Sequence, residues 1–179
     1  ANIQSGQKVL IYGASGNIGS AAVQIAKVFG AEVTGVCSSL NFELVKSLGA
    51  EKIFDITKEN FLENGQIYDV ILDASGKSST IHFKKLLNKK GFYLTTYPTI
   101  SILFQTLGTS MFNGKKVVFS ATGFKPISER LVFLQEIIKL FKEGKLKTII
   151  DRSFRLEQMA EAHRYVEGGL DKGNVVVNI

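Results

Sequence analysis

The sequence has very little of what disulfide-bonded, metal-binding and membrane proteins need. Cys37 is its single cysteine, which excludes an internal disulfide and a cysteine-rich zinc site. The two histidines, His82 and His163, have no metal-ligand partner at helical spacing, so we expect no zinc in this chain. No apolar run approaches the roughly 18 residues of a membrane span, and no secretory signal is recognisable. These shortages favour a cytoplasmic protein with no membrane partner.

Acidic residues are outnumbered by basic ones, 16 to 22, which gives a formal charge of +6. The lysines occur as scattered pairs, such as Lys84 with Lys85 and Lys115 with Lys116, and no aromatic residues are interleaved with them. A nucleic-acid site would need basic residues clustered on one face. We therefore expect no nucleic-acid partner, although the charge favours an anionic small molecule.

Short apolar runs rich in β-branched residues alternate with stretches of helical periodicity along most of the chain. The predicted strands cover residues 8–12, 33–37, 52–55, 70–73, 92–96 and 116–119. Continuous hydrophobic strands separated by helices are typical of a parallel sheet with helices on both faces. We therefore predict an α/β fold for residues 1–147, a Rossmann doubly wound sheet of six parallel strands in three layers, α/β/α.

The first predicted helix has apolar residues at helical spacing, and they define its expected buried face: Ile18, Ala22, Ile25, Ala26 and Phe29. Asn41 is expected to cap a second helix that ends at Leu48. A small helix is expected around Asn60 and another over residues 79–87. Beyond the sheet, residues 128–142 and 156–166 are predicted helices, and 148–154 and 174–179 predicted strands. We treat 148–179 as a separate C-terminal segment.

Three glycines, Gly13, Gly16 and Gly19, lie between the first predicted strand and the first predicted helix. Aligned with the pattern G-x-G-x-x-G, the three positions are Ala14, Gly16 and Gly19, so alanine replaces the first glycine. Gly16 lets the backbone approach a pyrophosphate, and Gly19 permits close packing of helix on strand. Free N–H groups at the helix start would hold the anion. This turn predicts a dinucleotide site.

The end of the second predicted strand indicates which dinucleotide is bound. An Asp or Glu there would bind the ribose 2′-hydroxyl of NAD and repel the 2′-phosphate of NADP. No acid follows that strand before Glu43, whereas Ser38, Ser39 and Asn41 can donate hydrogen bonds to a phosphate. We therefore favour NADP (NADPH) over NAD, although a polar turn and a helix cap would use the same residues.

Several runs resemble the medium-chain dehydrogenase/reductase superfamily, and its quinone oxidoreductase branch above all. They are residues 6–19 (GQKVLIYGASGNIG), 43–50 (ELVKSLGA), 68–76 (YDVILDASG), 160–168 (AEAHRYVEG) and 173–177 (GNVVV). The resemblance covers the whole chain in order. It implies that a GroES-like catalytic domain normally precedes these residues and that the segment 148–179 packs on that domain.

The resemblance also implies an activity. In the quinone oxidoreductase branch, hydride moves between NADPH and a quinone, enone or similar activated double bond, usually without zinc. Relatives dimerise through the sixth strand, here residues 116–119, so a homodimer and a small-molecule substrate are the expected partners. The motif and the resemblance together give the expected cofactor-binding residues: Ala14, Ser15, Gly16, Asn17, Ile18, Gly19, Ser38, Ser39, Asn41, Ala74, Ser75, Gly76 and Lys172.

Two other functions remain open at this point. One is a zinc-dependent alcohol dehydrogenase, whose metal ligands would lie mainly in the missing domain. The other is a non-catalytic nucleotide-sensing or RNA-binding relative, because one fold hosts many functions. No catalytic side chain stands out in the sequence. Its absence agrees with hydride transfer, in which the cofactor carries the chemistry and the protein aligns the reactants.

Overall fold

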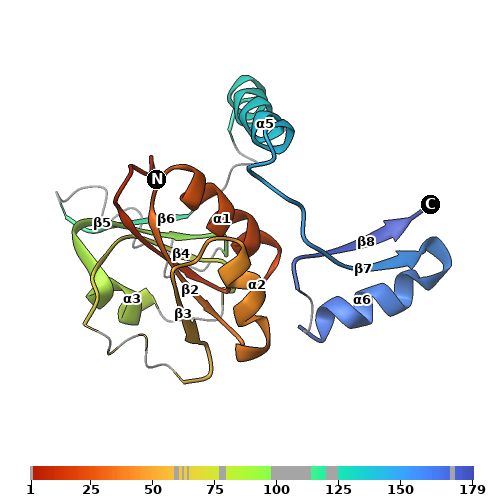
Figure 1. Ribbon diagram of the computed structural model, residues 1–179, viewed down its shortest axis with the longest axis horizontal. Coiled ribbons are helices and arrows are strands. Elements are labelled where there is room, and N and C mark those ends of the chain that lie inside the picture. The colour runs from red at the N-terminus through yellow and green to blue at the C-terminus, as the bar shows by residue number, and fades with distance from the viewer. Residues whose placement is uncertain are drawn as a thin grey trace.

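The computed structural model describes residues 2–58, 61, 63, 65–76, 80–97, 114–119, 125–169 and 172–179. Its main body is a parallel sheet with the strand order β3-β2-β1-β4-β5-β6 (Figure 1). The strands are β1 (Lys8–Tyr12), β2 (Glu32–Cys37), β3 (Lys52–Asp55), β4 (Tyr68–Asp73), β5 (Leu87–Thr95) and β6 (Lys116–Phe119). This order is that of the doubly wound dinucleotide folds, so the predicted fold class is confirmed.

Helices cover both faces of the sheet and give the predicted three layers (Figure 1). On one face, α1 (Asn17–Val28) and α2 (Phe42–Ser47) cover a core that includes Val23 and Val45. On the other face, α3 (Thr80–Leu86) contributes Phe83 to a second core. The stacked rings of Phe83 and Tyr93, with centroids 5.7 Å apart, join α3 to β5.

The C-terminal part forms a smaller unit beside the main sheet (Figure 1). It contains β7 (Ile150–Arg155), α6 (Met159–Glu167) and β8 (Asn174–Asn178), and β7 and β8 pair in parallel. The helix α5 (Ile127–Lys142) precedes this unit, lies apart from the main sheet and has no buried residue. The boundary at residue 148 stays a prediction, because the structure shows the segment without the domain on which it is expected to pack.

The predicted buried face of the first helix is confirmed at Ala26, while Ala22 and Ile25 are half-buried. It is wrong at Ile18 and Phe29, which are 43% and 53% exposed, whereas the buried residues of α1 are Gly19, Ser20, Val23, Gln24 and Ala26. The reason is the close approach of the helix at Gly19, where a Cβ atom would lie 2.0 Å from the Gly13 carbonyl oxygen. This contact turns α1 so that a partly polar face meets the protein.

The other helix and strand boundaries that the sequence predicts lie closer to the observed ones. The predicted helix over 79–87 ends at Leu86, and the chain enters β5 directly at Leu87. The extra strand residues follow from a register irregularity between β4 and β5, which pairs Tyr68 with Leu87 ahead of the regular ladder. The small helix expected around Asn60 lies outside the described residues.

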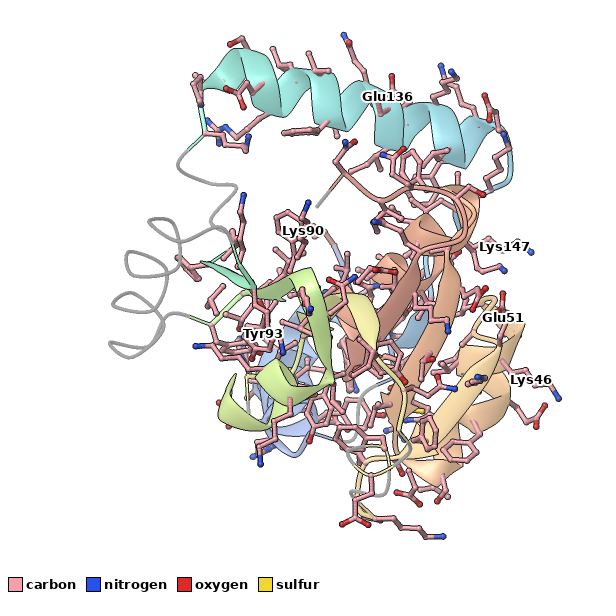
Figure 2. The ribbon with its side chains drawn as sticks, turned by 90° about the vertical axis from the view of Figure 1, so that its left-hand side faces the viewer. Lys46, Glu51, Lys90, Tyr93, Glu136 and Lys147 are labelled. Carbon is pink, nitrogen blue, oxygen red and sulfur yellow. The ribbon has the colours of Figure 1, made fainter. Side chains whose placement is uncertain are left out.

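Lysines are spread over the molecule: Figure 2 shows Lys46, Lys90 and Lys147 in different places.

The contact at Gly19 can be tested by Gly19→Ala. The added methyl group would overlap the backbone of residues 13–16, the turn expected to bind phosphate (the phosphate turn). We therefore expect the free energy of unfolding to fall by about 3 kcal/mol. Gly114→Ala is the matched control, since a Cβ atom at Gly114 would meet nothing within 4 Å. The measurement is urea denaturation of both variants. Equal midpoints would contradict the packing described for α1.

Candidate functional site

The carboxyl ends of β1 and β4 meet at the point where the strand order reverses. The chain runs outward from β1 through β2 to β3 on one side, and from β4 through β5 to β6 on the other. The turns after the two strands touch, because the Ala74 N–H donates to the Tyr12 carbonyl over 2.9 Å. Ligands of doubly wound sheets bind at such a switch point.

The turn after β1 is tied to the neighbouring strand. The N–H groups of Gly13 and Ala14 both donate to the Val36 carbonyl, over 2.9 and 3.0 Å. Ala14 is fully buried, and a Cβ atom on Gly35 would lie 3.2 Å from its methyl group. A glycine in β2 therefore gives room for the alanine that replaces the first glycine of the motif.

The N-terminus of α1 is open to a ligand. Its N-cap is Gly16 in an extended conformation, no side chain caps the helix, and no acidic residue lies in the first turn. The first N–H groups of an α-helix have no partner inside the helix, and the helix dipole makes this end positive. A Cβ atom on Gly16 would meet only the Gly13 carbonyl oxygen at 3.6 Å. These features fit a phosphate bound against the backbone.

Asn41 is the N-cap residue of α2, as predicted, but its side chain does not cap the helix. The helix has no side-chain cap hydrogen bond, and the Asn41 amide Nδ2 instead donates to Ser15 Oγ over 3.0 Å. The pairing links the segment after β2 to the phosphate turn. Asn41 is buried, with its Oδ1 unpartnered among the described residues, whereas Ser38 is half-buried and Ser39 exposed. The two serines are the predicted 2′-phosphate donors that lie at the surface.

A carboxylate that the sequence analysis overlooked lies at the same place. The parallel register pairs Asp55, the last residue of β3, with Cys37 at the end of β2. The Thr57 N–H and Oγ1 donate to Asp55 Oδ1 over 2.9 and 2.7 Å. These bonds, with a smaller contribution from the Ser39 side chain, hold the pKa of Asp55 below its usual value. The end of β2 therefore faces an acid supplied by the next strand.

The turn after β4 is shaped by a buried carboxylate. Asp73 Oδ1 accepts hydrogen bonds from the N–H groups of Ser75 and Gly76, each over 3.0 Å. Asp73 Oδ2 accepts from the Tyr93 hydroxyl over 3.0 Å. Gly76 has φ +66, and a Cβ atom there would lie 2.3 Å from the ring of Tyr97. The sequence indicated the turn 74–76 but none of the side chains that hold it.

The C-terminal unit reaches the phosphate turn at one point. The Gly173 N–H donates to the Ser15 carbonyl over 3.0 Å, and Gly16 and Gly173 form an isolated parallel bridge. Lys172, expected near the cofactor, is thus adjacent to the turn although it is far away in sequence. The structure brings together the expected residues of the turn, Asn41 and the neighbourhood of Lys172.

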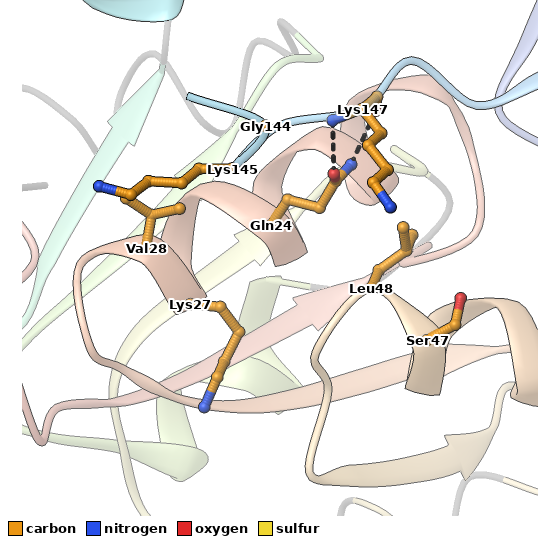
Figure 3. A pocket seen from close by; sticks show the side chains of 8 residues that line it. All are labelled: Gln24, Lys27, Val28, Ser47, Leu48, Gly144, Lys145 and Lys147. Atoms are coloured by element: carbon orange, nitrogen blue, oxygen red, sulfur yellow. Dashed lines mark hydrogen bonds between the residues drawn. The ribbon is translucent and has the colours of Figure 1, made fainter. Parts of the chain in front are cut away.

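A separate cavity of about 380 Å³ lies between the C-terminal end of α1, the end of α2 and the segment after α5. Gln24 spans it, since its Nε2 donates to the Lys147 carbonyl over 3.1 Å and its Oε1 accepts from the Lys147 N–H over 2.8 Å (Figure 3). α1 runs from the switch point to this cavity, so the cavity is not part of the candidate dinucleotide site.

The described residues contain neither a metal-ligand cluster nor a membrane-spanning helix. Within that part of the chain, no three His, Cys, Asp or Glu residues are grouped so that they could hold a metal ion. No helix in the same part is long and apolar enough to cross a membrane.

Cys37 lies beside the candidate site but is not poised for chemistry. Its side chain is 1% exposed, and burial, with a smaller effect of the Asp55 charge, raises its pKa to about 11. The thiolate is the nucleophilic form of cysteine. At neutral pH the folded protein therefore keeps this residue as a neutral thiol.

The raised pKa of Cys37 predicts a pH effect on stability. Above about pH 9 the unfolded chain loses the thiol proton, while the folded chain keeps it up to about pH 11. The contribution is complete below pH 9 and is lost as the pH rises to 11. We expect Cys37→Ala to lose less unfolding free energy over this range than the parent protein, as measured by urea denaturation. Parallel curves would contradict the assignment.

The chain matches known proteins along most of its length. A family model described as zinc-binding dehydrogenase matches residues 48–177. The mitochondrial NAD(P)H oxidoreductase RTN4IP1 of Mus musculus is 33% identical over 97% of this chain and 48% of its own length. The chloroplastic quinone-oxidoreductase QR1 of Triphysaria versicolor is 33% identical over 96% of this chain and 52% of its own length.

A solved structure agrees with these matches. The quinone oxidoreductase of Coxiella burnetii superposes with a TM-score of 0.85 at 28% identity, over 100% of this chain and 55% of that protein. The chain thus spans about half the length of the curated relatives it matches. The family model matches most of the chain, and the strand order and the glycine turn at the switch point are those of a doubly wound dinucleotide fold. This chain therefore belongs to the zinc-binding dehydrogenase family of the medium-chain dehydrogenase/reductase superfamily.

Proposed function

We propose that this chain is the cofactor-binding part of an NADPH-dependent oxidoreductase of the quinone reductase type. Its substrate would be a quinone, an enone or another small activated double bond. The observation that carries the proposal is the uncapped N-terminus of α1 at the switch point of the sheet. The names of the relatives, an NAD(P)H oxidoreductase and quinone oxidoreductases, support the same reaction class.

The proposed binding mode follows from the strand order. The pyrophosphate would accept hydrogen bonds from the first N–H groups of α1, beside Gly16. The adenosine half would extend over β2 towards Ser38 and Ser39, and the nicotinamide half over β4 towards Ser75 and Gly76. When bound, the cofactor supplies the hydride. The protein's part is to fix both halves, and the hydrogen bonds from the 74–76 turn to Asp73 would hold the nicotinamide side.

NADPH is proposed over NADH because the segment after β2 offers the hydroxyl of half-buried Ser38, and that of exposed Ser39 beside Asp55, to a 2′-phosphate. Asp55 opposes this preference, since its carboxylate lies close to Ser39 and stays ionised at neutral pH. The two effects predict a measurable but limited preference for NADPH.

Three further expectations belong to this proposal. Among the described strands, β6 is the last one of the sheet, which is the position that the expected homodimer through this strand requires. The absence of zinc from this chain and a cytoplasmic location stay predictions.

A zinc alcohol dehydrogenase would reveal itself by metal content, and a non-catalytic relative by failure to oxidise NADPH with simple quinones.

Calorimetric titration of the protein with NADPH and with NADH tests the proposal. We expect NADPH to bind more tightly by about tenfold, which is about 1.4 kcal/mol. Gly16→Val should abolish binding of both, because the branched side chain would occupy the space of the pyrophosphate. Unchanged affinity in a folded Gly16→Val variant would contradict the assigned site, and tighter NADH binding would contradict the 2′-phosphate assignment.

Asp55→Asn removes the opposing charge. We expect the ratio of NADPH affinity to NADH affinity to rise by about threefold, because only NADPH carries a 2′-phosphate near this carboxylate. Glu32→Gln is the matched control, since it makes the same chemical change at the exposed start of β2. Titration of both variants with both dinucleotides is the measurement, and an equal ratio in the two variants would show that the 2′ position lies elsewhere.

A further inference from the structure

The turn that carries Lys172 is fixed in shape and position. Gly173 has φ +88, and a Cβ atom there would lie 2.6 Å from the Ile149 carbonyl oxygen. The same carbonyl accepts hydrogen bonds from the Asn174 N–H and Nδ2, over 2.7 and 3.0 Å. On its other side the Gly173 N–H donates to Ser15. The turn at residues 172–173 is therefore held between Ile149, the residue before β7, and Ser15 of the phosphate turn.

The side chains of Asp151 and Tyr165, both in the C-terminal unit, form a hydrogen-bonded pair that holds this turn. Asp151 Oδ2 accepts a hydrogen bond from the Tyr165 hydroxyl over 2.6 Å and one from the Lys172 N–H over 3.2 Å. Tyr165 comes from α6, and its ring lies 4.3 Å from the Arg152 guanidinium carbon and 6.1 Å from the Phe154 ring centroid. These contacts fix the orientation of the phenol, which in turn engages the carboxylate.

The charge of Lys172 is left uncompensated by this arrangement. Among the described residues, no ion pair within 4.0 Å includes its ammonium group. The carboxylate next to it, that of Asp151, accepts hydrogen bonds from the phenol and from the backbone instead. Lys172 is exposed, and the residue after it, Gly173, pairs with Gly16 at the N-terminus of α1, so a lysine at this position favours an anion bound there.

We propose that Asp151 and Tyr165 are positioning residues for dinucleotide binding, an inference that rests on the proposed function. Their hydrogen bond holds the 172–173 turn against the phosphate turn. It also keeps the Asp151 carboxylate hydrogen-bonded to the phenol, so that the carboxylate does not pair with the Lys172 ammonium. The Lys172 ammonium is then available to a phosphate of the dinucleotide. Without the phenol hydroxyl, Asp151 loses its shorter hydrogen bond, and its carboxylate can compete with the ligand for Lys172.

A double-mutant cycle on the protein tests the coupling. NADPH affinity is measured by fluorescence titration at several salt concentrations for Tyr165→Phe, Lys172→Ala and the double variant. Lys172→Ala should weaken binding roughly tenfold and make it less dependent on salt, because an ion pair is lost. Tyr165→Phe should weaken binding about threefold and have no further effect when Lys172 is already replaced.

Two controls separate positioning from general stability. Tyr68→Phe removes the same hydroxyl group at the amino end of the central strand β4, opposite to the strand ends that carry the candidate site, and should leave the affinity unchanged. Asp151→Asn keeps an oxygen that can accept both hydrogen bonds but removes the charge that would compete for Lys172, so Tyr165→Phe should weaken binding less in the Asp151→Asn background than in the parent.

The outcomes are distinct. Non-additive effects of the Tyr165 and Lys172 changes, with a reduced salt dependence for Lys172→Ala, support the inference. Equal losses for Tyr165→Phe in both backgrounds, or an unchanged salt dependence for Lys172→Ala, overturn it while the proposed function stands. Failure of the parent protein to bind either dinucleotide overturns the proposed function, and this inference with it.

Discussion

The packing of α1 on the turn after β1 is the constraint on which the site depends. At Gly19 the helix lies so close to the Gly13 carbonyl that any side chain would overlap the backbone. This contact sets the direction of α1 and aims its uncapped N-terminus at the switch point between β1 and β4. A helix displaced outward by one methyl group would carry its N–H groups away from the place where the two strand-end turns meet.

Around this fixed helix end, the site is assembled by hydrogen bonds from distant parts of the chain. Asn41 reaches Ser15 from the segment after β2, and Gly173 reaches the same residue from the C-terminal unit. Asp73 shapes the turn after β4 and is itself held by Tyr93 of β5. Ser15 thus ties two distant segments to the phosphate turn, and a change in either of them is expected to affect that turn.

The electrostatics of the site are asymmetric. The N-terminus of α1, with Lys172 close to it in the chain fold, favours a pyrophosphate at the switch point. Towards the outer strands, Asp55 places a negative charge beside Ser39. In the proposed binding mode the central charges would serve any dinucleotide, whereas the outer carboxylate would act on the group that distinguishes NADPH from NADH. Affinity and cofactor preference are therefore assigned to different residues.

The sequence by itself determined the strand positions, the doubly wound fold and the glycine turn, because hydrophobic runs and turn glycines are local signals. Only the tertiary structure decided which face of α1 is buried, since Gly19 acts through a backbone contact that periodicity does not register. It also decided the partner of Asn41 and the placement of Asp55 and Tyr165, whose neighbours come from other strands and helices. Side chains brought together by parallel register and by chain reversal leave no spacing pattern in the sequence.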